Sequence, residues 1–188
     1  MKVKVKVPAT SANLGPGFDV AGLALTLYNT FTFELNEGGL NITGCPTQFC
    51  NEENLTYQAF NQAAQSCGLD FKGVNIHCES QVPYTRGLGS SSTCIVAGIV
   101  GAFAFKDKTD DRQEILELAT KIEGHPDNVA PAIFGGLTVS VMEEEQVLTL
   151  NIPVKHEYRF VALIPPFTLS TEESRKVLPQ TLGLSLIH

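Results

Sequence analysis

The sequence lacks a basic cluster and a long apolar run, and each absence argues against a class of protein. The 188 residues contain 13 Lys and Arg against 20 Asp and Glu, giving a net charge of −7. Nucleic-acid binding is therefore not expected, because it depends on cationic contacts to phosphate. The longest apolar run, residues 94–105, is too short to cross a bilayer and predicts a buried helix instead.

Two further absences concern the cell compartment. The five cysteines form no C-x-x-C pair, which favours reduced thiols over a disulfide framework or a zinc site. The first ten residues alternate lysine with valine and have no apolar core of the kind found in signal peptides. These features predict a cytoplasmic protein that has no membrane partner.

Strand and helix patterns are mixed along the chain. Alternating valines at residues 3–7 predict a half-buried strand, and the Gly- and Pro-rich residues 8–19 predict a loop after it. Helices are predicted over residues 54–67, 90–105 and about 111–123, and further strands over residues 30–35, 74–78, 136–142, 147–152 and 158–164. Because the strands and helices do not alternate as regular βαβ units, the pattern favours an α+β fold.

The segment VPYTRGLGSSST at residues 82–93 is the strongest local signal. Its glycines permit close approach of the backbone to a ligand, and its serines open an apolar helix whose first amides favour an anion. Serine hydroxyls are also oxygen ligands of the type that Mg²⁺ prefers. A turn before a serine-capped helix would give the same pattern, and no lysine follows as in a Walker loop. Alone, the segment predicts an anion site.

Four segments together resemble a known family. PYTRGLGSSST matches the P-x-x-x-G-L-G-S-S motif of the GHMP kinases, a superfamily of small-molecule kinases. PATSANLGPGFDVAGLAL and HPDNVAPAIFGG resemble two signatures of the homoserine kinases within it, and STEESRKVLP resembles a third. The resemblance extends over residues 2–181. It implies an α+β fold of the ribosomal protein S5 domain 2-like type, in which helices pack on a mostly antiparallel sheet.

The resemblance also implies a division of the chain and a nucleotide site. Residues 1–165 would form the ATP-binding N-terminal domain, and residues 166–188 would begin a C-terminal domain that is truncated here. The family's metal ligands match Ser90 and Glu123, which would bind Mg²⁺. The ATP phosphates would be bound by Pro83, Tyr84, Thr85, Arg86, Gly87, Leu88, Gly89, Ser90, Ser91, Ser92 and Thr93.

The acceptor site follows from the same resemblance. The homoserine-binding positions match Asn13, Asp19, His125, Asn128, Thr171 and Arg175, and the catalytic positions match Ser90, Glu123 and Asn128. Each has a structural alternative, because Asn and Asp also favour turns and most glutamates and arginines are simply solvated. No residue is assigned as a general base. Asp19 is the nearest candidate, but its expected role is binding.

The implied reaction transfers the γ-phosphate of ATP to the hydroxyl of L-homoserine, giving O-phosphohomoserine in threonine biosynthesis. A homodimer is a further expectation, because a domain without its packing partner exposes apolar surface. Two alternatives stay open: a nucleotide-binding fragment that does not catalyse transfer, and another small-molecule kinase of the superfamily. The apolar residues 182–188 do not resemble the family's continuation.

A carboxylate clamp at Arg175 is testable by substitution. Arg175→Ala should raise the KM for homoserine far more than the KM for ATP, because only the amino acid carries the carboxylate that a guanidinium would bind in bidentate fashion. Steady-state kinetics with each substrate varied in turn checks this. An equal effect on both constants would argue against the clamp.

Overall fold

The computed structural model describes residues 1–15, 17, 19–144, 146–155 and 157–162. Its sheet has the strand order β3-β4-β2-β5-β6, and β1 also pairs with β2. Among the described strands only the β3–β4 pair is parallel, so the α+β, mostly antiparallel prediction is confirmed. The strands are β1 (Lys2–Ser11), β2 (Ala21–Asn36), β3 (Leu40–Thr43), β4 (Gly73–Glu79), β5 (Leu137–Glu143) and β6 (Gln146–Ile152).

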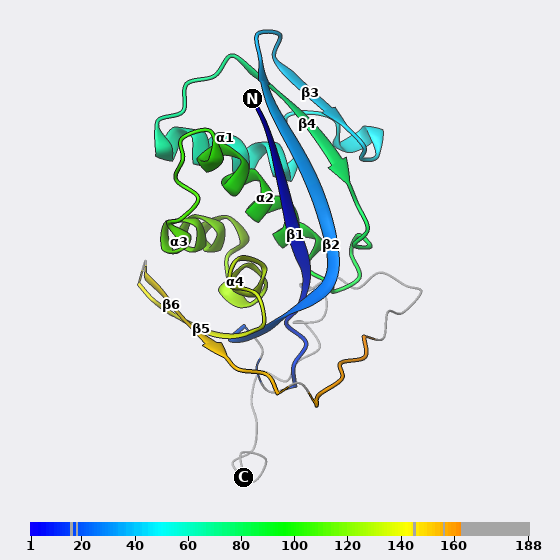
Figure 1. The fold of residues 1–188 in the computed structure, drawn as a ribbon, viewed down its shortest axis with the longest axis vertical. Helices are drawn as coiled ribbons and strands as arrows, with labels where there is room; N and C mark the ends of the chain where they lie inside the picture. Colours follow the sequence, from blue (N-terminus) through cyan, green and yellow to red (C-terminus); the bar gives the residue numbers. More distant parts are fainter. Residues whose placement is uncertain (16, 18, 145, 156, 163–188) are drawn as a thin grey trace, which may run out of the picture.

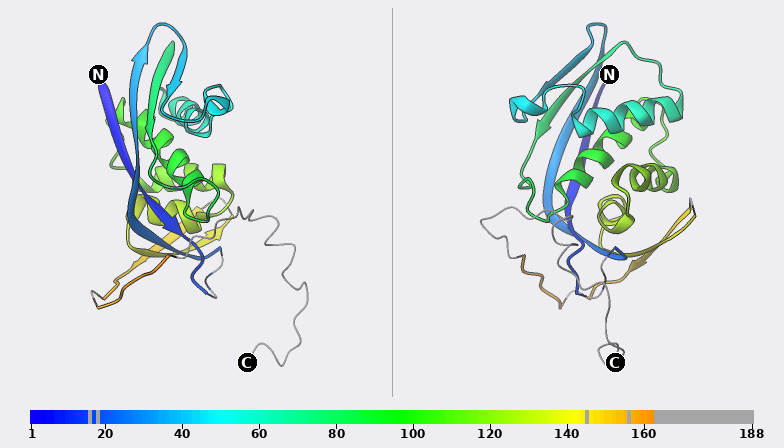
Figure 2. Two further views of the ribbon diagram at one scale, coloured as in Figure 1. Left: turned by 90° about the vertical axis from the view of Figure 1, so that its right-hand side faces the viewer. Right: turned by 180° about the vertical axis from the view of Figure 1, so that it is seen from behind.

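The described residues form four α-helices. These helices cover one face of the sheet, as Figures 1 and 2 show. Helix α2 packs against the other three helices and against β1 and β2. These contacts explain why its sequence is apolar on nearly every side. The other face of β1 presents its lysines to water. The helices are α1 (Leu55–Cys67), α2 (Ser90–Ala104), α3 (Arg112–Glu123) and α4 (Pro126–Phe134), and a 3₁₀ turn spans Thr47–Phe49.

The helix boundaries follow from capping chemistry that the sequence shows. The side chain of Asn54 accepts hydrogen bonds from the first amides of α1, and Asp111 accepts one from Glu114 at the start of α3. Gly68 and Gly124 end these helices in the left-handed conformation. The predicted helices over residues 54–67, 90–105 and 111–123 are confirmed to within one residue at each end.

The structure corrects three expectations. The first strand does not end before Pro8 but continues to Ser11, because a register shift between Pro8 and Thr10 accommodates a residue that has no amide proton. Residues 126–134, which were not predicted as a helix, form α4 with Pro126 at the first position, where no amide proton is needed. The described part of the predicted strand 158–164 is not a strand.

The hydrophobic core lies between the sheet and the helices. Phe33 on β2 stacks on Phe60 of α1 with ring centroids 5.4 Å apart. Phe105 packs edge-on against the ring of Phe60, with a centroid distance of 6.3 Å. Where α1 and α2 cross, Gly98 lets the two backbones approach closely. Among the described residues, no helix combines the length and apolarity needed to cross a membrane.

Gly98→Ala tests the closeness of this crossing. An added Cβ would lie 2.4 Å from the carbonyl oxygen of Thr56 and 2.8 Å from the amide nitrogen of Phe60, so a backbone must move. We expect a loss of about 1–3 kcal/mol in the free energy of unfolding, despite the better helix propensity of alanine. Urea unfolding measures it, with the exposed Gln62→Ala as the control on α1. A Gly98→Ala variant as stable as the control would contradict the packing.

Candidate functional site

The glycine–serine segment lies in the connection from β4 to α2. Its two glycines, Gly87 and Gly89, are required for different physical reasons. Both adopt positive φ, 68° at Gly87 and 64° at Gly89. An added Cβ on Gly87 would meet nothing within 4 Å, so only its backbone conformation favours glycine. A Cβ on Gly89 would lie 2.0 Å from Oγ1 of Thr10. Gly89 is therefore fixed by the close approach of the loop to β1.

The loop is also held to β1 by a backbone hydrogen bond and by a small apolar cluster. The amide of Thr10 donates to the carbonyl of Leu88 at 3.1 Å. The Leu88 side chain is buried with Ala9 and Val82, next to the start of the long strand β2. Leu88 thus points into the protein and anchors the loop between its two glycines.

The N-terminus of α2 follows this loop directly. Gly89 is the N-cap residue and has no side chain with which to cap the helix, in contrast to Asn54 and Asp111 on α1 and α3. The first backbone hydrogen bond of the helix runs from the amide of Thr93 to the carbonyl of Gly89 at 2.9 Å. The amides of residues 90–92 precede that bond and lie at the positive end of the helix dipole, where an anion is stabilised.

Glu123, the last residue of α3, lies against this helix start. Its Oε1 accepts hydrogen bonds from the hydroxyls of Ser91 at 2.9 Å and Ser92 at 3.1 Å. The predicted pair was Ser90 with Glu123, and among the described contacts it is the next two serines that reach the carboxylate. A carboxylate and hydroxyls gathered at one point form a set of hard oxygen donors, so the residues present fit Mg²⁺.

A second cluster lies where α3 passes into α4. Nδ1 of His125 lies 2.5 Å from Oδ1 of Asp127, and ligand atoms of these residues and of Asp19 lie within 4.8 Å of one another. The hydrogen bond to Asp127 raises the pKa of His125, burial opposes that shift, and the charges of Asp127, Glu123 and Asp19 add to it. Asp19 and His125, far apart in sequence, thus come together in a strongly anionic environment.

Asp127 organises this cluster, and sequence reasoning missed it. The residue is 3% exposed, and its Oδ1 also accepts a hydrogen bond from Nδ2 of Asn128 at 3.0 Å. Its position in the sequence, close to the predicted site residues His125 and Asn128, could have indicated it. A buried carboxylate needs hydrogen-bonding partners of this kind. Its carbonyl oxygen lies so close to β2 that a Cβ on Gly22 would overlap it, which explains the glycine in the segment VAGLAL.

Thr10 joins the two clusters. It is fully buried, its amide binds the carbonyl of Leu88, and its hydroxyl donates to Oδ1 of Asn128 at 2.8 Å. One residue on β1 therefore contacts both the glycine loop and the start of α4. The carboxamide of Asn128 is held between Thr10 and Asp127, and this fixes which end is oxygen and which is nitrogen.

Three predicted site residues are not brought into these clusters by the described contacts. Asn13 is exposed, and its amide binds the hydroxyl of Ser11 at 3.3 Å, a turn contact. Thr171 and Arg175 lie outside the described residues, as does the predicted domain boundary at 165/166. Their roles stay predictions.

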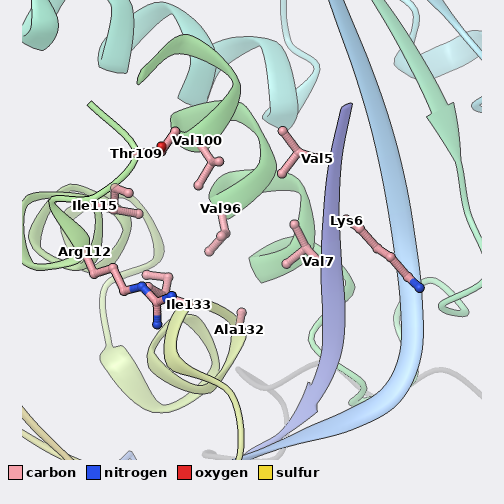
Figure 3. A pocket seen from close by; sticks show the side chains of 10 residues that line it. All are labelled: Val5, Lys6, Val7, Val96, Val100, Thr109, Arg112, Ile115, Ala132 and Ile133. Atoms are coloured by element: carbon pink, nitrogen blue, oxygen red, sulfur yellow. The ribbon is translucent and has the colours of Figure 1, made fainter. Parts of the chain in front are cut away.

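The hollow shown in Figure 3 is separate from this site. It has a volume of about 150 Å³ and lies between β1 and the helices α2, α3 and α4. Its lining is mainly aliphatic, and the Lys6 side chain points away from it toward the ring of Tyr28, with Nζ 4.2 Å from the ring centroid. None of the predicted site residues that the structure describes lines it.

The fold and the loop define a class of protein. Residues 54–136 match the model of the GHMP kinases N terminal domain. Among curated proteins, the homoserine kinases of Clostridium beijerinckii and Clostridium botulinum (strain Alaska E43) are 50% and 47% identical to it over 97% and 96% of this chain. The chain spans 61% of the length of each.

Solved structures agree with this assignment. The homoserine kinase of Cytophaga hutchinsonii is 26% identical, with a TM-score of 0.81 over 99% of this chain and 62% of that one. The mevalonate kinase of Methanococcus jannaschii, 14% identical, has a TM-score of 0.63 over 82% of this chain and 56% of that one, and shows the fold alone. The predicted resemblance to GHMP kinases, and to homoserine kinases among them, is confirmed.

The His125–Asp127 contact predicts a pH dependence of stability. Because the pKa of His125 is raised above 6.5, the folded chain binds this proton more tightly than the unfolded chain. The stabilisation is fully present below about pH 6.5 and is lost as the pH rises through the folded-state pKa.

Urea unfolding at a series of pH values checks this. The difference in unfolding free energy between the wild type and His125→Gln should shrink as the pH rises above about 6.5. Asp127→Asn should remove the same pH-dependent component, because it removes the main cause of the raised pKa. A difference that stays constant with pH would contradict the assignment.

Proposed function

We propose that this chain contributes the ATP- and acceptor-binding half of a homoserine kinase, which transfers the γ-phosphate of ATP to the hydroxyl of L-homoserine. The observation that carries the proposal is the contact of Glu123 with the serines that open α2. It joins a carboxylate suited to metal binding to a helix start suited to phosphate, directly beside the His125 cluster. The high identity to homoserine kinases supports this choice of acceptor over other small alcohols.

The nucleotide would lie on the loop between β4 and α2. The amides at the start of α2 would bind phosphate oxygens. Glu123 would hold Mg²⁺ with the hydroxyl of Ser91, which contacts it, and with that of Ser90, which the family resemblance implies. The bound metal would neutralise charge on the phosphates during transfer. Two aromatic residues, Phe49 and the loop residue Tyr84, are 44% and 39% exposed, and their ring centroids lie 6.4 Å apart. They would offer the adenine base a surface for stacking.

The acceptor would lie at the Asp19, His125 and Asn128 cluster. A carboxylate at Asp19 suits the ammonium group of an amino acid, and the fixed Asn128 carboxamide can orient a hydroxyl by hydrogen bonding. Catalysis of phosphoryl transfer depends mainly on positioning and on neutralising charge, so a general base is not required. The carbonyl and amide ends of Asn128 are fixed before substrate arrives, which lowers the cost of orienting the acceptor.

Calorimetry and a coupled assay test the proposal on the chain as it exists. Mg·ATP is titrated first, and homoserine-dependent ADP release is then measured, with mevalonate and galactose as alternative acceptors. Binding followed by turnover with homoserine is the expected result. Binding without turnover would favour the nucleotide-binding fragment, turnover only with another acceptor would favour a different kinase of the superfamily, and no binding by folded protein would overturn the nucleotide site.

The metal site is tested by substitution at Glu123. Glu123→Gln should weaken Mg²⁺-dependent ATP binding, and lower any turnover by about 100-fold, because an amide is a poor ligand for this ion. Glu117→Gln is the matched control, because Glu117 is a carboxylate earlier on α3 that accepts a hydrogen bond from Gln113. Ser90→Ala and Ser91→Ala then decide which hydroxyl takes part. Unchanged metal dependence in Glu123→Gln would remove Glu123 from the site.

A further inference from the structure

A buried asparagine occupies a position where the strand pattern calls for an apolar side chain. Asn29 lies on β2 on the same face as Phe31 and Phe33, which belong to the hydrophobic core, and it is 1% exposed. Placing a carboxamide there costs free energy unless all of its polar atoms are paired. A polar residue at a core position that breaks the strand's own pattern is a marker of function.

The described side-chain hydrogen bonds of Asn29 all involve the segment that carries the glycine loop. Its Oδ1 accepts hydrogen bonds from the amides of Gln81 at 2.8 Å and Val82 at 2.9 Å, and its Nδ2 donates to Oγ1 of Thr93 at 2.9 Å. The Thr93 hydroxyl in turn donates to the carbonyl of Ser90 at 2.8 Å. One side chain therefore binds both ends of the connection, where it leaves the sheet and where it enters α2.

The place of Asn29 in the sheet explains this arrangement. The pairing of β2 with β4 ends at Thr30 and Glu79, so the next amides of the departing chain lose their partners on β2. The Oδ1 of Asn29 supplies an acceptor for two of them. The loop can leave the sheet here without an unpaired buried amide at Val82, and its path toward Gly87 is fixed from its first residue.

We propose that Asn29 is a positioning residue for the nucleotide: it sets the distance between the start of the glycine loop and the first turn of α2, and thereby the width of the phosphate site. The inference rests on the proposed function. The hydrogen-bond chain from Asn29 through Thr93 to Ser90 reaches the backbone of a predicted Mg²⁺ ligand. Asn29 touches neither phosphate nor metal and acts through the residues that do.

Substitutions at both partners test the proposal. Asn29→Ala removes every bond, Asn29→Asp keeps the acceptor and loses the donor to Thr93, and Thr93→Val removes the hydroxyl that Thr93→Ser retains. Asn75→Ala is the matched control, because Asn75 accepts a side-chain bond from Asn36 on the same pair of strands, away from the loop. All variants are compared by urea unfolding, so that local effects are separated from a loss of global stability.

Amide hydrogen exchange gives a readout that does not depend on activity. Exchange at Gln81 and Val82 should be about tenfold faster in Asn29→Ala, while amides of the β1–β2 pairing keep the protection expected from global stability. If Asn29→Ala does not fold, Thr93→Val against Thr93→Ser gives the same comparison in the first turn of α2. Unchanged exchange in the loop would overturn the proposal.

Ligand affinity gives the second readout. Asn29→Ala and Thr93→Val should each weaken Mg·ATP binding about tenfold while homoserine binding changes by less than about twofold, and Thr93→Ser should resemble the wild type. Equal losses for both ligands would indicate a merely structural role and would overturn the proposal. A wild type that binds no Mg·ATP would refute the proposed function, whereas the exchange experiment would still decide whether Asn29 holds the loop.

Discussion

Gly89 and Thr10 lie so close together that no side chain fits between them, and this contact connects the two clusters of the site. Thr10 is fixed by the pairing of β1 with β2, and it passes that fixed position to the glycine loop through Leu88 and to α4 through Asn128. Packed backbone has little freedom to adjust, because interiors are as dense as crystals of small organic molecules. The separation of the loop from the start of α4 is therefore determined by the sheet.

Polar side chains at buried positions give this frame its specificity. Asn29, Asp127 and Thr10 are buried, and the side chain of each makes hydrogen bonds in the described part of the chain. Apolar packing tolerates small shifts, whereas a paired carboxamide or carboxylate accepts only a narrow range of geometries. These residues favour one arrangement of loop and helix starts, at the cost of the desolvation that their hydrogen bonds must offset.

Sequence reasoning predicted features that depend on neighbouring residues and missed those that depend on long-range packing. The caps at Asn54 and Asp111 and the apolar stripe of α3 are local signals, and these helices were predicted correctly. The continuation of β1 beyond Pro8 depends on its pairing with β2, which no local pattern shows. The candidate site was predicted mainly from motif resemblance. The requirement for glycine at residue 89 could not be predicted, because it comes from close packing against Thr10, which is distant in sequence.

The turn between α3 and α4 connects the proposed metal ligand to the proposed acceptor-binding residues. Glu123 ends α3, Gly124 reverses the chain at a φ of 95°, and His125 begins the next helix. Because Gly124 alone separates Glu123 from His125, the distance between the Glu123 carboxylate and the cluster around Asp127 can vary very little. Transfer of a phosphoryl group requires its donor and acceptor to be held in line at short distance. A short covalent connection between two packed helices meets that requirement more reliably than a flexible loop, because the strand and helix contacts of α4 fix it on both sides.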